Sequence, residues 1–448
     1  MAPLLRAAPQ TPRPGGGTAN QRLLLDSLTL DPSRELIVGV LPHTQCAPTV
    51  EGCGFCTFPH DRHDKRGLRH VAHAVGREIS AAPEELRARS VVAVYLGGAT
   101  ANLTPPAQLR EVLSALGSTF SLAGAEVTLE GVPSLFLAWW GGPLEVLRDG
   151  PGGTRRVSMG VQTFDREWLA RMGRLGFGDR RVVEQVVARA HGYGMTTSGD
   201  FLLGLPGRPA ADELQDLRVA VELGLDQICA YPLVLAGDTP WALDPAMRAS
   251  MPAVEEGRHR WRAACAQLVA AGYTQTTLTN FERGAARFRY EVASYAVDRT
   301  DAVGFGPLAI STFVDPAARR AVKTQRARAV DPSPVDPIGL WFPYEAEDLS
   351  LLFVTRSLAA LRVDRARYRA LLGADLLEHH GPVVRAVVDA GLATLDDAAL
   401  ALTTDGTWFA DAVAGTFAEA RAAEVRIGAA GQHTADQSSG RVLTLHMG

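Results

Sequence analysis

Cysteine and lysine are both scarce in this chain of 448 residues, which contains five cysteines and only two lysines, Lys65 and Lys323. Five cysteines at irregular spacing in so long a chain exclude a small secreted domain held together by disulfides. Arginine supplies the rest of the 45 basic residues, and the formal net charge is −4. Without an excess of positive charge, the composition does not favour nucleic acid or an anionic membrane surface as a partner.

Long hydrophobic runs are also absent. No window approaches the roughly 18 uninterrupted apolar residues of a membrane span, and the first 20 residues, rich in Pro, Gly and Ala, lack the apolar core of a signal peptide. We therefore expect a cytoplasmic protein with reduced thiols and no membrane partner. The apolar content of 46% is ordinary for a globular protein.

Three of the five cysteines, Cys46, Cys53 and Cys56, lie within the eleven residues CAPTVEGCGFC. A reducing compartment disfavours a disulfide with one spare thiol and favours a shared metal centre. Three thiolates with one open position suit a [4Fe–4S] cluster, whereas the addition of His60 would suit a closed Cys3His zinc site. Cys229 and Cys265 lie in apolar strand and helix patterns and are predicted to be inert core residues.

Short apolar runs alternate with amphipathic stretches of helical period through the first half of the chain. This pattern predicts a parallel sheet with covering helices, either doubly wound or rolled into a barrel. The predicted strands are 35–41, 91–96, 126–131, 156–161, 196–205 and 227–235, and the helices between them include 107–117, 165–173, 180–194 and 211–224.

The pattern changes after about residue 240. Residues 249–273 predict one long helix, and TQTTLTNF and AVGFGPLAIST predict antiparallel strands in an irregular region. A compact mixed module follows, with helices near 346–360, 364–372 and 382–391 and a small β-wing at LATLDDAALALTTDG.

Polar or glycine-rich features fall at the carboxyl ends of the predicted strands, where parallel α/β folds place their ligand chemistry. The cysteines follow the first strand and GGAT follows the second. Glu130, Gln162, Asp200 and Tyr231 mark the next four strands. Each feature alone has an ordinary structural explanation, but their joint placement favours a functional site.

Several long motifs, in order, resemble radical S-adenosylmethionine (SAM) enzymes of the branch around oxygen-independent coproporphyrinogen oxidase. The resemblance runs from about residue 35 to about 420. Its motifs are YLGGATANLTPPAQL, VTLEGVP, RRVSMGVQTFDREWLARMGR, GDFLLGLPG, YPLVLAGDTP and, for a winged-helix-like module, SLLFVTRSLAALRVDRARYRALLG through LTTDGTWFADAV.

The resemblance implies a partial (βα)6 barrel of the TIM type with an irregular C-terminal extension and a small winged-helix-like module. The expected boundaries are a partly disordered N-terminal extension at 1–34, the radical SAM barrel at 35–245, a helix and β extension completing the core at 246–345, the winged-helix-like module at 346–425 and a flexible tail at 426–448.

The resemblance also implies the site. Cys46, Cys53 and Cys56 would hold a [4Fe–4S] cluster, and SAM would bind its open iron. The residues that match SAM-contacting positions are Phe55, Gly97, Gly98, Thr100, Glu130, Gln162, Arg174 and Asp200. A reduced cluster would split SAM to methionine and a 5′-deoxyadenosyl radical, with the electron supplied by a protein such as flavodoxin or ferredoxin. Tyr231 would face a small-molecule substrate.

The chain departs from this family at three places. The first cysteine gap has six residues where the family has three, which a loop accommodates at little cost in closure entropy. Only about 34 residues precede the first strand, fewer than in the porphyrin enzymes. The stretch YEVASYAVD (290–298) lacks the His and Trp that the related heme chaperones carry in this region.

Three functions are consistent with the resemblance. We expect C-methylation or cyclopropanation of a natural-product intermediate, with a second SAM as the one-carbon donor. The alternatives are oxidative decarboxylation or another tetrapyrrole reaction, and a non-catalytic heme-binding role. Arg62, Arg66 and Arg69 could line a pocket for propionates, but we interpret HDRHDKRGLRH as a solvated loop. Residues 381–392 lack the basic footprint of a DNA-recognition helix.

Overall fold

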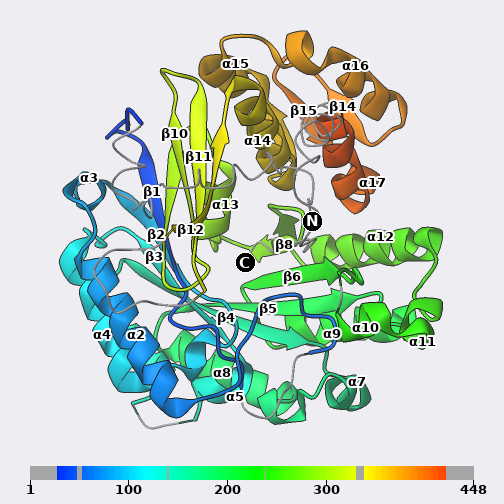
Figure 1. The fold of residues 1–448 in the computed structure, drawn as a ribbon. Coiled ribbons are helices and arrows are strands. Elements are labelled where there is room, and N and C mark those ends of the chain that lie inside the picture. Colours follow the sequence, from blue (N-terminus) through cyan, green and yellow to red (C-terminus); the bar gives the residue numbers. More distant parts are fainter. Residues whose placement is uncertain (1–27, 48–52, 139–140, 238, 329–337, 420–448) are drawn as a thin grey trace, which may run out of the picture.

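The computed structural model describes residues 28–47, 53–138, 141–237, 239–328 and 338–419 (Figure 1). The predicted disorder of the first 20 residues and of the tail after residue 426 lies outside this described part. No helix within it is both long enough and apolar enough to cross a membrane.

One sheet of twelve strands organises the described part of the chain. Its central strands run parallel in the order β9-β1-β2-β3-β4-β5-β6, which is the arrangement of a partial TIM-type barrel. Their bounds are β1 Glu35–Val40, β2 Val91–Leu96, β3 Glu126–Gly131, β4 Thr154–Gln162, β5 Thr196–Leu203, β6 Gln227–Pro232 and β9 Thr300–Phe305. The six strands predicted from the apolar runs are all present.

Antiparallel strands extend the sheet at both edges. On one side lie β10 Ile310–Asp315, β11 Arg320–Arg326 and β12 Ile338–Tyr344, and on the other β8 Asn280–Arg283 and β7 Tyr273–Gln275. The prediction of antiparallel strands in TQTTLTNF and AVGFGPLAIST is correct for β7, β8 and β10, but it is wrong for β9, which pairs in parallel with β1 along its whole length. The strands β11 and β12 were not predicted. Strand direction depends on a partner 260 residues away, which no local pattern contains.

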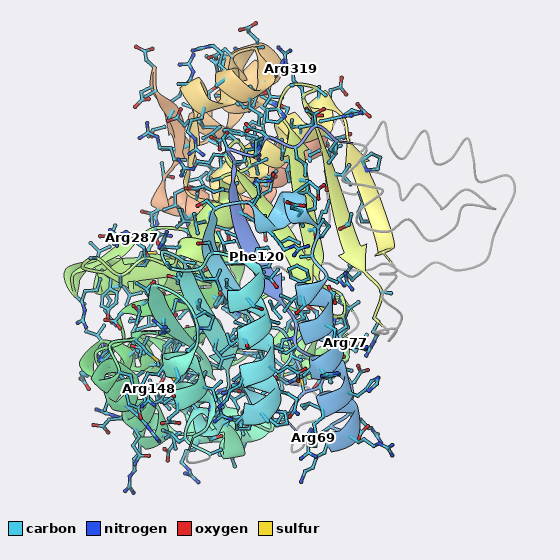
Figure 2. The ribbon with its side chains drawn as sticks, turned by 90° about the vertical axis from the view of Figure 1, so that its left-hand side faces the viewer. Arg69, Arg77, Phe120, Arg148, Arg287 and Arg319 are labelled. Atoms are coloured by element: carbon cyan, nitrogen blue, oxygen red, sulfur yellow. The ribbon has the colours of Figure 1, made fainter. Side chains whose placement is uncertain are left out.

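Helices cover the outer face of the sheet. They include α2 Lys65–Ser80, α4 Pro106–Thr119, α8 Arg180–Gly192, α9 Ala210–Glu222 and α12 Val254–Ala270. Alternate strand residues such as Val38, Val94 and Val157 point to these helices and form the main apolar core. Figure 2 shows α2 and α4 side by side on this face.

The interpretation of HDRHDKRGLRH as a loop holds for residues 60–64 and is wrong for residues 65–70, because α2 begins at Lys65. The carboxylate of Asp64 accepts hydrogen bonds from the backbone N–H groups of Arg66 and Gly67, which caps the helix. Arg62, Arg66 and Arg69 are exposed, so they line no enclosed pocket for propionates.

The opposite face of the sheet is covered by a short helix, α13 Arg289–Tyr295, which contacts β1, β2 and β9. Gly39 of β1 makes room for Tyr290, because a Cβ atom at Gly39 would lie 2.7 Å from the Tyr290 hydroxyl. Figure 1 shows α13 between the sheet and the C-terminal helices. This face, called the inner face below, carries the polar residues of the barrel.

The C-terminal module has helices α14 Ala346–Ala359, α15 Arg365–Leu372, α16 Leu376–Asp389 and α17 Thr404–Trp408, with a small sheet of β13 Arg362–Asp364, β15 Ala399–Leu402 and β14 Ala393–Leu395. Its apolar core also includes Val314 and Ala321 from β10 and β11. The module therefore shares its core with the extended sheet.

A buried ion cluster joins β9 to the start of β1. Both carboxylate oxygens of Asp301 accept hydrogen bonds, one from Arg34 at 2.9 Å and the other from Arg89 at 3.0 Å. All three residues are at most 4% exposed. Buried charges of this kind are tolerated only when they are paired.

Removing the central carboxylate by Asp301→Ala would leave two guanidinium groups buried without their counter-ion. We expect a loss of about 3–5 kcal/mol in the free energy of unfolding, measured by urea denaturation. The control, Glu167→Ala, breaks an exposed pair with Arg171 and should cost about 0.5 kcal/mol or less. Equal effects of the two substitutions would show that the buried cluster does not hold β9 in place.

Candidate functional site

The three clustered cysteines lie at the carboxyl end of the parallel strands. All three are free thiols with partial exposure. Burial, followed by the neighbouring thiols of Cys56 and Cys53, raises the pKa of Cys46 to about 12. Burial likewise raises the pKa of Cys56, and the Cys53 thiol adds to this. Thiols that oppose one another's ionisation in this way become thiolates when a metal centre displaces their protons.

The chemistry of this donor set fits an iron–sulfur cluster. Among the described residues, however, no three His, Cys, Asp or Glu side chains are already arranged as a metal site, and residues 48–52 of the first gap fall outside the described part. His60, the fourth ligand of the zinc alternative, places its Nδ1 3.2 Å from the carbonyl oxygen of Phe58. The assignment of Cys46, Cys53 and Cys56 as ligands therefore stays a proposal.

An aromatic clamp, formed by Trp241, Phe55 and Trp168, holds the loop between Cys53 and Cys56. The Trp241 ring lies 5.6 Å from the Phe55 ring and 5.8 Å from the Trp168 ring, and its backbone N–H donates to the carbonyl of Gly54. Gly54 has a φ of +77°, and a Cβ atom there would fall 2.1 Å from the Trp241 indole nitrogen. Only glycine fits this position.

The backbone of the GGAT segment after β2 lies very close to neighbouring side chains. A Cβ atom on Gly97 would lie 2.2 Å from the Tyr95 ring and 2.5 Å from a Glu130 oxygen, and the backbone N–H of Gly98 donates to Glu130 at 3.2 Å. The hydroxyl of Thr100 accepts from the backbone N–H of Ala47 at 3.2 Å, next to Cys46. The segment thus joins the cysteine loop to the third strand.

Gln162 and Arg174 meet at the end of β4. Gln162 has a φ of +70°, which is strained for a residue other than glycine, and the register between β4 and β5 shifts at this point. Arg174 donates to the carbonyl of Gly160 at 2.5 Å and to the sulfur of Cys53 at 3.2 Å. Arg174 therefore supports the cysteine loop directly.

Two carboxyls predicted to contact SAM, Glu130 and Asp200, lie half-buried on the inner face. Burial, and then the charge of Glu130, raises the pKa of Asp200 to about 7. Burial also raises the pKa of Glu130, against hydrogen bonds from Tyr95 and Gly98. Neither carboxyl has a cation that it does not share, because Arg156 and Arg174 act on both.

The structure adds inner-face residues that the sequence patterns did not indicate. Cys229 was predicted to be inert core; it is buried, but its thiol lies 2.5 Å from the side-chain oxygen of Asn280 and also hydrogen-bonds Asp200. Asn280 in turn donates to Glu291, whose pKa burial raises to about 7. A polar chain therefore runs from Asp200 to α13. In the sequence, only the alternation of residues within β6 could have predicted this role, because it places Cys229 on the same face of the sheet as Tyr231.

Arg156 lies at the centre of the inner face and is 1% exposed. Its Nε donates to Gln227 at 2.6 Å, and its guanidinium lies 3.7 Å from the centre of the Phe288 ring. The two terminal nitrogens have no hydrogen-bond partner among the described residues. Its charge stabilises the ionised forms of Glu126, Glu130, Asp200 and Glu291.

Tyr231 is 39% exposed, although surrounding protein raises the pKa of its hydroxyl well above the ordinary value. It therefore borders a solvent-accessible part of the inner face and keeps its proton at neutral pH. This position is consistent with the predicted contact with substrate.

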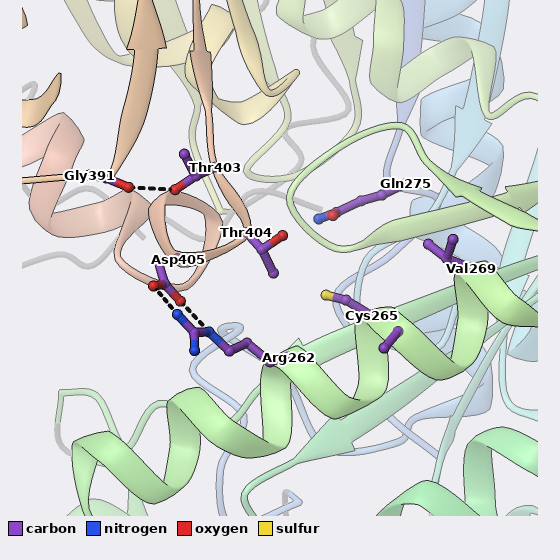
Figure 3. Close-up of a pocket in the computed structure, with 9 residues that line it drawn as sticks. Arg262, Cys265, Val269, Gln275, Gly391, Thr403, Thr404 and Asp405 are labelled. Carbon is purple, nitrogen blue, oxygen red and sulfur yellow. Dashed lines mark hydrogen bonds and ion pairs between the residues drawn. The ribbon is translucent and has the colours of Figure 1, made fainter.

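A separate pocket of about 600 Å³ lies between α12 and the C-terminal module. Figure 3 shows Cys265 and Arg262 of α12 on one side and Thr404 and Asp405 on the other, with Arg262 paired to Asp405. Cys265 is buried and its pKa is raised to about 12, so its thiol is unreactive. None of the predicted site residues lines this pocket.

The comparisons with known proteins agree with this fold. Residues 50–220 match the model of the Radical SAM superfamily. The solved structure of coproporphyrinogen III oxidase (HemN) from Escherichia coli, described as a radical SAM enzyme, superimposes with a TM-score of 0.72 at 20% identity and covers 89% of this chain and 93% of that one. The chain thus has a radical SAM domain.

The curated relatives indicate which branch of radical SAM proteins this domain resembles. Heme chaperone HemW of Escherichia coli (strain K12) is 25% identical over 297 residues, which are 62% of this chain and 72% of HemW. Anaerobilin synthase of Escherichia coli O157:H7 is 28% identical over 253 residues, 55% of this chain but only 54% of the relative. The domain is thus similar to radical SAM proteins of the coproporphyrinogen oxidase-like branch. Its cofactors are accordingly a [4Fe–4S] cluster and SAM.

The clamp on the cysteine loop leads to a first test of the site. We expect Gly54→Ala to force Trp241 away and to lose most of the iron and acid-labile sulfide after anaerobic reconstitution. Gly124→Ala is the control, because nothing lies within 4 Å of a Cβ atom there. A full cluster content in Gly54→Ala would show that the clamp does not position the loop.

The enclosed carboxyl of Asp200 leads to a second test. Because its folded pKa, about 7, exceeds the ordinary 3.8, the folded state binds this proton more tightly and loses stability as pH rises from about 4 to 7. We expect Asp200→Asn to raise the free energy of unfolding of the cluster-free protein by about 1–3 kcal/mol at pH 8 relative to pH 5. Exposed Glu167→Gln should show no such difference, and a flat profile for both would contradict the assignment.

Proposed function

We propose that this protein is a radical SAM enzyme that transfers a one-carbon unit from a second SAM to a carbon of a small-molecule substrate. When bound, the reduced cluster and the first SAM supply a 5′-deoxyadenosyl radical that abstracts hydrogen. The residues of this chain bind, orient and enclose the reactants. The electron comes from an external protein reductant.

One observation carries this proposal: among the described residues, half-buried carboxyls outnumber cations on the inner face of the parallel strands β3 to β6 and on the neighbouring helix α13. Among the described residues, Glu130, Asp200 and Glu291 face the positive charges of Arg156 and Arg174, and Arg174 is already engaged with Cys53. Each SAM carries a sulfonium and an ammonium against one carboxylate, hence a net charge of about +1 at neutral pH. Two SAM molecules would offset the excess of negative charge.

The polar groups also divide into two sets. Gly97, Gly98, Thr100, Glu130, Gln162, Arg174 and Asp200 serve the first SAM by resemblance to the family. A second set, made by Cys229, Asn280, Glu291 and Tyr231, lies on β6, β8 and α13, next to the accessible space. This second set is where we place the second SAM and the reacting carbon, with the Tyr231 hydroxyl as a hydrogen-bond donor.

A tetrapyrrole function is the second candidate, because of the proteins that this chain resembles. Coproporphyrinogen III oxidase, anaerobilin synthase and heme chaperone HemW are named for porphyrin or heme chemistry. Against this, the described inner face near Tyr231 is acidic, and a substrate with four propionates would meet repulsion there. The exposed arginines of α2 do not correct this imbalance.

The test is product analysis by mass spectrometry after anaerobic reconstitution, with a strong reductant and SAM carrying a deuterated methyl group. We expect 5′-deoxyadenosine and S-adenosylhomocysteine together, with deuterium in the deoxyadenosine if hydrogen is taken from the methyl group of the second SAM. Cys46→Ala, which removes one proposed cluster ligand, should form neither product.

Other outcomes would overturn the proposal in distinct ways. Deoxyadenosine without S-adenosylhomocysteine, and conversion of added coproporphyrinogen, would establish the oxidative function. Cluster-loaded protein that forms neither product but retains added heme would establish a binding role. Wild-type activity in Cys46→Ala would show that the first cysteine is not a ligand.

A further inference from the structure

The N-terminal end of α2 carries exposed positive charge beside the cysteine loop. Residues 62–77 contain five Lys or Arg residues and one acidic residue, whereas the whole chain has a formal net charge of −4. Four of the five lie at or before the second turn of the helix and are exposed: Arg62, Lys65, Arg66 and Arg69. These four residues are called the cationic patch below. Figure 2 shows Arg69 near one end of α2 and Arg77 further along the same helix.

This placement of charge is unfavourable for the helix itself. The partial positive charge of a helix N-terminus repels cations, yet Lys65 and Arg66 occupy the first turn of α2, which contains no Asp or Glu. Lys65 and Arg69 are four residues apart on one face of the helix, where like charges repel each other. Lys65, Arg66 and Arg69 form no ion pair with another described residue. The stability of the fold therefore does not account for these charges.

The start of α2 is joined directly to the segment that carries Cys46. Gln45 and Asp61 form a parallel β-bridge. The backbone N–H of Asp61 donates to the carbonyl of Thr44 at 2.8 Å, and the backbone N–H of Cys46 donates to the carbonyl of Asp61 at 3.4 Å. The backbone N–H of Asp64, which caps α2, donates to the side-chain oxygen of Gln45 at 2.7 Å. The cationic patch is therefore held beside the cysteine loop.

A cluster bound to this loop would lie near the protein surface. Cys46, Cys53 and Cys56 are each partly exposed, and residues 53–60 are all half-buried. Because electron transfer slows steeply with distance, a protein that donates an electron to the cluster must dock where the cluster comes close to the surface. The cationic patch borders this place, and its charge is complementary to an acidic partner.

We propose that the cationic patch is the docking surface for a small acidic electron-transfer protein of the flavodoxin or ferredoxin type. The reduced partner loses one electron and the oxidised cluster gains it, and no bond between the two proteins forms or breaks. This surface rests on the part of the proposed function that takes the electron from an external protein, and it is the same for any substrate.

The scarcity of lysine allows the contact to be mapped. A carbodiimide joins a lysine amine to a carboxylate that lies in an ion pair with it. Of the two lysines, Lys65 is exposed and Lys323 on β11 is half-buried. We expect carbodiimide treatment of the cluster-loaded protein with flavodoxin to join Lys65 to an Asp or Glu of the flavodoxin, as identified by peptide mass spectrometry. Lys65→Arg keeps the charge, so it should lose the cross-link but keep the rate of cluster reduction.

Reduction kinetics measure what the charge contributes. In the triple variant Lys65→Gln, Arg66→Gln, Arg69→Gln, we expect reduced flavodoxin to reduce the cluster about tenfold or more slowly than in the wild type at low ionic strength. The measurement is anaerobic stopped-flow absorbance of the cluster. The difference should disappear at about 0.5 M salt, because exposed charges are then screened.

A second triple variant controls for net charge. Arg77→Gln, Arg87→Gln, Arg385→Gln removes the same charge from exposed positions at the far end of α2, on the short helix α3 Glu84–Arg87 and on α16. This variant should be reduced by flavodoxin at the wild-type rate. Illuminated 5-deazariboflavin, a small reductant that needs no docking surface, should reduce the wild type and both variants equally.

Several outcomes would overturn the proposal. Equal slowing of the two triple variants would show a general effect of net charge, and cross-links that avoid Lys65 would place the partner elsewhere. Slower reduction of the patch variant by 5-deazariboflavin as well would assign the patch to support of the cluster. Binding of duplex RNA by the patch, with unchanged reduction by flavodoxin and ferredoxin, would assign it to nucleic acid. Cluster reduction is followed without substrate, so failure of one-carbon transfer is distinguishable from failure of docking.

Discussion

Enclosure of like charges on the inner face of the curved sheet is the constraint on which the rest of this structure depends. Glu130, Asp200 and Glu291 are drawn into one polar interior, and burial raises the pKa of each. An interior of this kind cannot be filled with apolar side chains in the way that a closed core is. The fold therefore obtains its apolar packing elsewhere, from the outer face of the sheet and its helices.

The same constraint selects what binds. Cations are favoured beside the carboxyls at the ends of β3 and β5, which matches the sulfonium and ammonium of SAM.

The cysteine loop depends on neighbours that belong to no cysteine motif. Trp241, which follows β6, packs against Gly54, and Arg174, which follows β4, donates to Cys53. These contacts come from two different strand ends and hold the second half of the loop. The longer spacing between Cys46 and Cys53 is thus combined with a firmly held segment between Cys53 and Cys56. This combination makes the unusual spacing compatible with the radical SAM fold.

Much of the architecture could be predicted from local pattern. Three features depend only on neighbouring residues: the apolar runs of β1 to β6, the helical periods between them and the polar residues at their ends. These features could therefore be predicted from the sequence. The direction of β9 could not be predicted in this way, because it is decided by β1 and by the buried ion cluster of Asp301 with Arg34 and Arg89. The cap of α2 at Asp64 is also a local signal, because the capping carboxylate directly precedes the helix in the sequence.

The sequence by itself therefore determined the class of fold, the family and the residues that meet at the strand ends. Only the tertiary structure decided that Cys229 joins a polar chain and that Trp241 clamps the cysteine loop. These relations connect residues separated by 30 to 190 positions, and they arise because curvature of the sheet brings distant side chains into one enclosed space, where charge and packing are set by neighbours in space and not by neighbours in sequence.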